Sequence, residues 1–169
     1  MADTPTIALN IQGGQLTGKV TVAKEAPILH LKGQIELVMG VNPSRQTLSF
    51  NGQVLDDTQT VKFYNLISGA TVILAMTPLA GDPKFLIMLS SGSWNYAVNV
   101  KETGLVEDLK AKIGKKWAVP ATDVTLTRHG EEMEDGFPLS AYLVCEDCVV
   151  GFKVNNEMLT TPPPYIKND

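Results

Sequence analysis

Long apolar runs and an apolar leader are missing from this sequence of 169 residues. Its longest apolar stretches, at residues 71–76 and 85–89, are far shorter than the roughly 20 residues that cross a bilayer, so we expect no membrane partner. The first five residues carry neither the basic region nor the apolar run of a secretory signal. We therefore expect a cytoplasmic or nuclear location, or both, where thiols stay reduced.

Histidine and cysteine are scarce, with two of each. Neither His30 nor His129 has a serine and a carboxylate in a recognisable triad order, and no phosphate-binding glycine loop occurs. Cys145 and Cys148 form a C-x-x-C, which supplies two of the four ligands of a structural zinc site. As a redox pair they would need a helix N-terminus to lower a thiol pKa, whereas small buried or loop thiols are the simpler interpretation. We predict a protein that is not an enzyme and uses neither metal nor cofactor.

A basic excess is missing too. The 14 basic and 18 acidic residues give a net charge of -4, which argues against a nucleic-acid partner. The charge is uneven, because residues 1–81 hold five basic and five acidic residues while residues 82–169 hold nine and thirteen. This asymmetry is a first indication that the chain has two parts.

What the chain does contain is an internal repeat. An offset of 78 residues aligns residues 20–76 with residues 98–154 without a gap, and 12 of these 57 pairs are identical, against about four expected from composition. The identical pairs are Val20/Val98, Val22/Val100, Leu31/Leu109, Lys32/Lys110, Ile35/Ile113, Val41/Val119, Thr47/Thr125, Leu48/Leu126, Gly52/Gly130, Asp57/Asp135, Tyr64/Tyr142 and Val72/Val150. Most are residues that a core needs, so the repeat indicates two copies of one domain rather than a solenoid.

Both copies have the same order of predicted elements. An alternating strand, a turn and a second alternating strand come first, as in a β-hairpin. A helix follows, with apolar residues at helical spacing such as Ile28, Leu31 and Ile35, and it stops near Gly40 in the first copy. A strand, a short strand and a final strand complete the copy. This order predicts an α+β fold in which one main helix packs on one face of a mixed sheet.

Four stretches carry a family resemblance. Residues 48–57 read LSFNGQVLDD, residues 60–66 read TVKFYNL, residues 109–113 read LKAKI and residues 130–136 read GEEMEDG. They resemble the Leu-x-Phe-x-Gly-x-x-Leu-x-Asp and Thr-Leu-x-x-Tyr-x-Ile runs of ubiquitin, its Val-Lys-Ala-Lys-Ile helix and its Gly-Lys-Gln-Leu-Glu-Asp-Gly turn. The resemblance implies two tandem ubiquitin-like domains with the β-grasp fold. It also implies that Tyr64 and Tyr142 each hold a loop through a hydroxyl bond to the backbone.

The resemblance covers nearly the whole chain and sets the expected domain bounds. We expect an N-terminal extension at residues 1–5, ubiquitin-like domains at residues 6–77 and 84–154, a linker at residues 78–83 and a proline-rich tail at residues 155–169. The linker is short and holds two prolines, which predicts a restricted relative orientation of the domains.

The conjugating end of the family is not found where the resemblance would place it. No Gly-Gly pair occurs after the second domain, and the first domain is followed by Leu79-Ala80-Gly81, with a single glycine. A covalent modifier of the tandem type is therefore the disfavoured alternative.

The family's exposed apolar patch, which receptors grip, is altered in both copies. By resemblance its central isoleucine matches Ser49 and Thr127, and its last-strand valine matches Ala75 and Lys153. These replacements remove apolar area where binding energy concentrates. The first copy keeps the more neutral face, with Ile73 beside the altered positions. These five residues are our candidate protein-binding residues, and faces that bind nothing ubiquitin-like are the open alternative.

The tail contains Pro-Pro-x-Tyr within residues 161–165. It resembles the ligand motif of WW domains, in which prolines preset the polyproline II conformation and an aromatic groove accepts proline and tyrosine. Pro162, Pro163 and Tyr165 would make the contact with a WW-domain partner, and a simple proline-rich terminus is the alternative.

Taken together, these features predict a non-enzymatic, tandem ubiquitin-like adaptor or scaffold. We expect protein partners in ubiquitin-pathway or protein-turnover assemblies. Since the two domains differ in charge, we expect their partners to differ.

Overall fold

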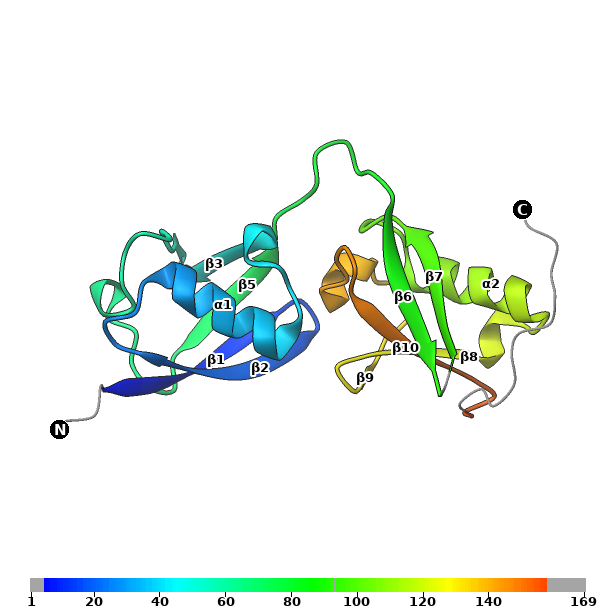
Figure 1. The fold of residues 1–169 in the computed structure, drawn as a ribbon, viewed down its shortest axis with the longest axis horizontal. Coiled ribbons are helices and arrows are strands. Elements are labelled where there is room, and N and C mark those ends of the chain that lie inside the picture. Colours follow the sequence, from blue (N-terminus) through cyan, green and yellow to red (C-terminus); the bar gives the residue numbers. More distant parts are fainter. Residues whose placement is uncertain (1–4, 93, 158–169) are drawn as a thin grey trace. The chain divides into compact units, whose positions relative to one another are not determined.

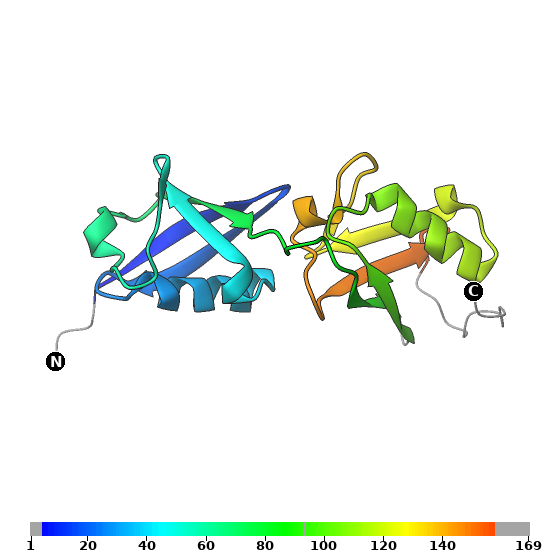
Figure 2. The same cartoon turned by 90° about the horizontal axis from the view of Figure 1, so that it is seen from above.

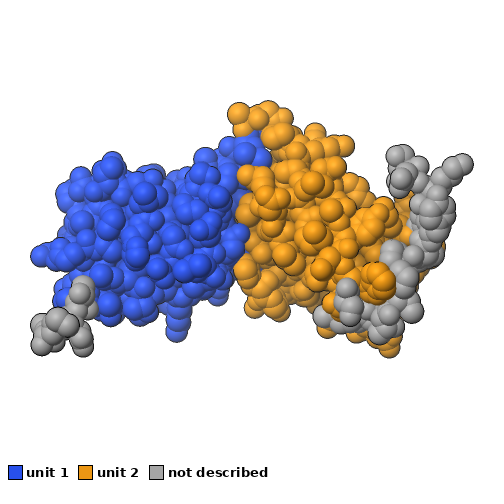
Figure 3. All heavy atoms as spheres, in the orientation of Figure 1, with its two compact units in different colours: residues 1–79 blue, residues 80–169 orange. Residues whose placement is uncertain are grey.

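The computed structural model describes residues 5–92 and 94–157. The chain divides into two compact units, Met1–Leu79 and Ala80–Asp169, which Figure 3 colours blue and orange. We call them unit 1 and unit 2. The finer bounds expected from the sequence, including the linker at residues 78–83, stay a prediction.

Unit 1 is a mixed five-stranded sheet with one main helix (Figure 1). The strands lie in the order β2-β1-β5-β3-β4, and only the central pair, β1 and β5, is parallel. The elements are β1 (Thr6–Gly13), β2 (Leu16–Ala23), α1 (Ile28–Met39), β3 (Gln46–Phe50), β4 (Gln53–Val54) and β5 (Thr71–Met76), with short 3-10 turns at Pro43–Arg45 and Lys62–Tyr64.

Unit 2 repeats this arrangement, with the strand order β7-β6-β10-β8-β9 and a parallel pair of β6 and β10. Its elements are β6 (Phe85–Ser91), β7 (Trp94–Val100), α2 (Val106–Trp117), β8 (Val124–Arg128), β9 (Glu131–Glu132) and β10 (Val149–Val154), with 3-10 turns at Ala121–Asp123 and Leu139–Tyr142. In each unit the helix covers one face of the sheet (Figure 2). The predicted α+β fold of two tandem β-grasp domains is therefore confirmed.

The core of each unit forms between the helix and one face of the sheet. The predicted helical stripe of unit 1, Ile28, Leu31 and Ile35, has no exposed surface. It packs over the sheet residues that alternate inward, such as Leu9 and Ile11 on β1. The helix ends at Met39 because Gly40 takes the left-handed conformation (φ 70°) and donates its backbone N–H to the carbonyl of Glu36.

Neither helix has a side-chain cap at its N-terminus. The first amides of α1 instead donate to carbonyls of the loop before Thr60, with Ile28 bonded to Gln59 (2.8 Å) and Leu29 to Asp57 (3.2 Å). In α2 the Val106 amide donates to a carbonyl on the matching loop, at 3.0 Å. The long loop therefore satisfies donors that a helix start leaves unpaired.

The structure gives a role to two of the repeated residue pairs, Lys32/Lys110 and Asp57/Asp135. Lys32 and Asp57 form an ion pair between helix and loop at 2.6 Å, and the equivalent Lys110 and Asp135 form one at 2.8 Å. Each lysine is largely buried while its partner is half exposed or more, so the aliphatic stem packs and the charged end reaches the carboxylate.

The repeated tyrosines have the role that the resemblance implied. The Tyr64 hydroxyl accepts the backbone N–H of Asp56 at 2.7 Å, and the Tyr142 hydroxyl accepts that of Glu134 at 2.8 Å. Tyr142 is buried, whereas Tyr64 is half-buried. In both units this bond fastens the long loop before the last strand.

Candidate protein-interaction surfaces

The open face of each sheet, opposite the helix, is the place where the resemblance locates a binding surface. In unit 1 the structure brings three candidate residues together on it. Ser49 pairs in register with Ile73, and Ala75 is the next outward-facing residue on β5. Ile73 is 45% exposed and Ala75 is exposed, while Ser49 is half-buried. This part of the face is therefore small, neutral and moderately apolar. Val54 on β4, which pairs in register with Ser49 and is 63% exposed, extends this apolar part of the face.

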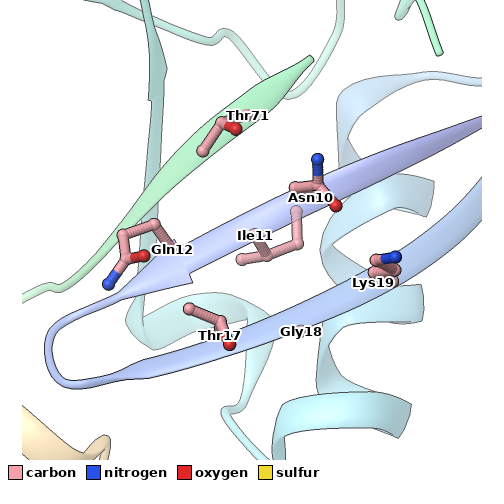
Figure 4. Close-up of a pocket in the computed structure, with 7 residues that line it drawn as sticks. All are labelled: Asn10, Ile11, Gln12, Thr17, Gly18, Lys19 and Thr71. Carbon is pink, nitrogen blue, oxygen red and sulfur yellow. The ribbon is translucent and has the colours of Figure 1, made fainter. Parts of the chain in front are cut away.

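The part of the face over β1, β2 and the start of β5 is mostly polar. A shallow hollow of about 440 Å³ lies over β1, β2 and β5 (Figure 4). The Asn10 amide donates to the Gly69 carbonyl (3.2 Å) and the Gln12 amide to the Gly14 carbonyl (2.9 Å), so both amides have partners within the unit. The hollow is lined by Asn10, Ile11, Gln12, Thr17, Gly18, Lys19 and Thr71.

In unit 2 the candidate residues Thr127 and Lys153 lie on neighbouring strands of the open face. Thr127 pairs in register with Gly151, and Lys153 pairs with Thr125. Gly151 occupies the position of Ile73, and a Cβ there would lie only 2.5 Å from the Thr127 hydroxyl. The centre of this face therefore lacks the apolar side chain that unit 1 retains.

An apolar strip lies elsewhere on the same face of unit 2. Its larger side chains are Leu86 and Met88 on β6 and Val149 on β10, which are 49%, 37% and 52% exposed. Met88 pairs in register with both Val149 and the small residue Ala97 of β7, so the four side chains are neighbours. We call this set the β6–β10 strip.

Sequence reasoning missed the β6–β10 strip, although the repeat contained the signal. The offset of 78 residues aligns Met88 with Asn10 and Val149 with Thr71, both of which line the polar hollow of unit 1. An exposed strand position that is polar in one copy and apolar in the other marks a surface that has diverged. To recognise such a position from the sequence, one must first know which residues of each strand face outward.

The helices also differ on their outer sides. On α1, Leu29, Leu37 and Val38 are 54%, 79% and 45% exposed. The corresponding surface of α2 is polar and carries Lys110, Lys112, Lys115 and Lys116, most of which have partners within unit 2. Lys110 pairs with Asp135 and Lys112 donates to the Asn99 carbonyl at 2.8 Å.

A further lysine, Lys116, lies 4.2 Å from the ring centre of Tyr96, a cation–π geometry. Tyr96 in turn packs edge-on against Trp117, and Trp117 packs against Phe152. The lysines of α2 are therefore held largely by contacts within unit 2 and do not form an unpartnered positive patch.

The cysteines are buried, whereas the histidines are exposed. Cys145 and Cys148 are buried and not joined by a disulfide, as the simpler interpretation predicted. No helix N-terminus lies at the pair, yet the pKa of Cys148 is lowered to about 7, chiefly by a hydrogen bond with the Cys145 thiol and also by the nearby Arg128 guanidinium. His30 is exposed on α1, and His129 is exposed in the hairpin turn.

The described part of the chain contains neither a metal-binding cluster nor a membrane-spanning helix. Among residues 5–92 and 94–157, no three His, Cys, Asp or Glu side chains are grouped so that they could hold a metal ion. No helix in that part of the chain is long and apolar enough to span a membrane. The tail residues Pro162, Pro163 and Tyr165 lie outside the described residues, so their predicted contact with a WW domain stays a prediction.

Comparison with known proteins identifies relatives. A family model described as the ubiquitin family matches residues 9–79, within unit 1. Ubiquitin domain-containing protein DSK2 of Saccharomyces cerevisiae is 33% identical over 69 residues, which are 41% of this chain and 18% of DSK2. NEDD8-like protein RUB1 of the same yeast is 34% identical over 70 residues, which are 40% of this chain and 91% of RUB1. The solved structure of an Arabidopsis thaliana ubiquitin-like domain, at 19% identity and a TM-score of 0.44, covers 47% of this chain and 85% of that domain.

Proposed function

The chain belongs to the ubiquitin family, and from this premise we propose that it is a non-enzymatic adaptor or scaffold whose two units bind different proteins. The observation that carries the proposal is that exposed apolar side chains lie at different positions on the two open sheet faces. In unit 1 they gather at Val54, Ile73 and Ala75, and in unit 2 they form the β6–β10 strip. One fold with two differently placed apolar surfaces suits two partners better than one.

Interface energetics support a binding role for these positions. Exposed Leu, Met, Val and Ile side chains release water when a partner covers them, and each contributes of order 1 kcal/mol or more when its burial is completed. Met88 and Val149 are adjacent on paired strands, so a single partner segment covers both. Ile73 lies beside Ser49 in the same way. We place these contacts in ubiquitin-pathway or protein-turnover assemblies, in the cytoplasm, the nucleus or both.

The repeat offers matched variants for a test. In unit 2, Met88→Asn and Val149→Thr together install the residues that the sister strands carry at these positions. In unit 1, Ile73→Gly installs the residue that unit 2 has there, and Ile73→Thr is its strand-compatible control. Each set changes one face and leaves the helices and cores unaltered.

The readout is quantitative mass spectrometry of proteins captured by the full-length chain and by each variant. We expect the unit 2 double variant to lose one set of partners and the Ile73 variants to lose another, each about 5- to 30-fold, because a loss of 1–2 kcal/mol has that effect. If both variants lose the same partners, the two-partner proposal is wrong. If neither loses any, the sheet faces are not the binding surfaces.

The tail provides a further proposed contact. Pro162, Pro163 and Tyr165 would dock on a WW domain, with the prolines preset in the polyproline II conformation. Tyr165→Ala in the full-length chain is expected to abolish binding to an isolated WW domain measured by calorimetry. Unaltered affinity would remove this contact from the proposal.

The alternative function, a covalent modifier of the tandem type, has its own signature. A modifier forms conjugates that persist under denaturing conditions, whereas an adaptor does not. Immunoblotting of a tagged chain after denaturing purification distinguishes them, with an unshifted band expected for the adaptor. A ladder of heavier species that disappears when Gly81 is substituted would support the modifier instead.

A further inference from the structure

The two cysteines of unit 2 occupy the ends of a four-residue turn that leads into β10. The backbone N–H of Cys148 donates to the Cys145 carbonyl at 3.2 Å, which closes the turn. Asp147, the third residue, takes a left-handed conformation with φ of 61°. Cys145 and Cys148 are 3% and 7% exposed, and their sulfurs share a hydrogen bond. Both thiols therefore lie together at the edge of the core.

Unit 1 contains the same turn without thiols. There the N–H of Ala70 donates to the Ile67 carbonyl at 3.0 Å, and Gly69 occupies the left-handed position with φ of 91°. Ile67 and Ala70 align with the two cysteines by the offset of 78 residues. The turn is therefore a property of the fold, and the fold itself does not require cysteine at either end.

Two backbone bonds hold the cysteine turn against β6. The Asp147 N–H donates to the Leu86 carbonyl and the Met88 N–H donates to the Cys148 carbonyl, both at 2.9 Å. The ends of the turn are thus held in place by the sheet. A four-residue turn keeps its first and last Cα atoms within about 7 Å, and disulfides join Cα atoms about 4.4–6.8 Å apart. The two ranges overlap, so a disulfide can join the ends of a turn of this kind without a large change in the backbone.

A buried cation also distinguishes this turn from its counterpart. Arg128 is 5% exposed and donates to the Leu143 carbonyl at 3.1 Å and to the Val149 carbonyl at 3.3 Å, one on each side of the turn. Unit 1 has Phe50 at the aligned position. A guanidinium beside a thiol favours the thiolate, which is the nucleophilic form. Unit 2 therefore differs from unit 1 by two thiols and by the positive charge that activates one of them.

We propose that Cys148 is a site of reversible oxidation by hydrogen peroxide and that Cys145 resolves it to an intramolecular disulfide across the turn. The Cys148 thiolate attacks one peroxide oxygen, the O–O bond breaks, and the departing hydroxide takes up a proton to leave as water. The resulting sulfenic acid is attacked by the Cys145 sulfur, which forms the S–S bond and releases a second water. In total, two thiols lose two electrons and two protons, and one peroxide is reduced to two waters.

The burial of the two sulfurs limits the size of the oxidant that can reach them. Hydrogen peroxide is small enough to reach a thiol with limited exposure, whereas a bulky disulfide such as oxidised glutathione needs the turn to open. We therefore expect peroxide to oxidise the folded chain faster than oxidised glutathione at equal concentration. Reduction of the product by a dithiol restores both cysteines.

The direct test uses the full-length, reduced chain. After brief exposure to peroxide and removal of the excess, the chain is denatured and alkylated with iodoacetamide. Trypsin is expected to yield residues 129–153, with both cysteines in one peptide. We expect that peptide to lack both alkyl groups and to have lost the mass of two hydrogens, and treatment with dithiothreitol before alkylation to restore both sites. Cysteines that remain fully alkylated after peroxide would overturn the proposal.

The pH dependence of the reaction separates an activated thiol from an ordinary one. Because the pKa of Cys148 is about 7, the rate at which peroxide oxidises this thiol should rise through pH 7 and level off above pH 8. The rate is measured from the fraction of cysteine that iodoacetamide no longer alkylates. An ordinary thiol continues to gain rate to about pH 9. A profile that follows the ordinary thiol would exclude activation by the turn.

Three variants assign the roles. In Cys145→Ser, the sulfenic acid of Cys148 has no resolving thiol and should be trapped by dimedone. In Cys148→Ser, Cys145 should remain alkylatable after the same exposure, and oxidation as fast as in the native chain would refute the assignment. Arg128→Gln should shift the pH profile upward, and amide NMR spectra report whether this variant keeps its fold. If it does not, the native-chain measurements still decide the proposal.

Discussion

Units 1 and 2 have the same strand order and helix placement but differ on most of their surfaces. What they share is a small set of interactions: apolar residues beneath the helix, a lysine–aspartate pair at the helix, and a tyrosine that fastens the long loop. What they do not share is the chemistry of their outward faces. A few internal contacts are therefore enough to keep this fold while the surface changes.

The helices illustrate this most clearly. Their inner stripes coincide, with Leu31 and Leu109 both buried. Outside, α1 exposes Leu29 and Leu37, whereas α2 carries Lys112, which donates to the Asn99 carbonyl, and Lys116, which lies over the Tyr96 ring. Burial constrains the inner stripe equally in both units, while nothing in the fold constrains the outer one.

The largest effect is expected from the shared core. Leu31→Ala and Leu109→Ala each remove a buried side chain and leave a cavity, so each should lower the free energy of unfolding of its own unit by about 2–5 kcal/mol. Urea titration followed by residue-resolved NMR measures both units in one sample. If one variant costs far less than the other, the two cores are not packed equivalently.

The next effect separates the units by pH. The pKa of the Cys148 thiol is about 7 in the folded chain against 9.0 for the ordinary thiol, so between these values the folded state binds fewer protons than the unfolded state. The stability contributed by this group is present above pH 9 and is lost as the pH falls through 7, with a difference on the order of 2 kcal/mol. Unit 1, which has no cysteine, should lack this dependence.

Denaturation of the reduced chain at pH 7 and pH 9 checks this expectation. Cys148→Ala is the control and should remove the difference in unit 2. A native unit 2 with equal stability at both pH values would show that the thiolate is not preferentially stabilised by folding.

A smaller effect is expected from the loop tyrosines. Tyr64→Phe and Tyr142→Phe each leave a backbone N–H without its acceptor, which costs about 1–3 kcal/mol when the site is buried and less when water can replace the hydroxyl. Because Tyr142 is buried and Tyr64 is half-buried, the cost should be greater in unit 2. Thermal unfolding of each variant measures it, and a larger loss for Tyr64→Phe would reverse the expected order.

The smallest effect belongs to the outer side of the helices. Leu37 is 79% exposed, so Leu37→Lys should change the free energy of unfolding by no more than about 0.5 kcal/mol. The reciprocal Lys115→Leu introduces the aligned residue into α2. Chemical denaturation measures both, and a loss above 1 kcal/mol for Leu37→Lys would mean that this side chain packs against another part of the chain.

Much of the fold could be predicted because it depends on local patterns. The stripe at Ile28, Leu31 and Ile35 predicted the inner face of α1, and Gly40 marked its end. Asn51 and Gly52 form a residue pair typical of hairpin turns, and both take positive φ at the turn between β3 and β4. Such signals need only a residue and its near neighbours, since helical and strand periodicity act within a few positions.

The candidate surfaces were less predictable. Ser49, Ile73 and Ala75 were found through the resemblance and lie together, but the β6–β10 strip was not found at all. Leu86 and Val149 are more than 60 positions apart, and only the parallel pairing of their strands makes them neighbours. Strand register depends on the whole sheet, so no local pattern contains it.

By itself the sequence determined the number of copies, the order of their elements and the residues that face each core, because repetition and periodicity are properties of the chain. The tertiary structure alone decided which loop carbonyls satisfy the starts of the helices and which outward side chains adjoin. It also decided that Arg128 lies beside the Cys145–Cys148 turn, where it adds to the larger effect of the Cys145 hydrogen bond in lowering the pKa of Cys148, 20 positions further along the chain. The physical reason is common to all three: each depends on groups that are distant in sequence and meet only when the sheet and the helix have packed.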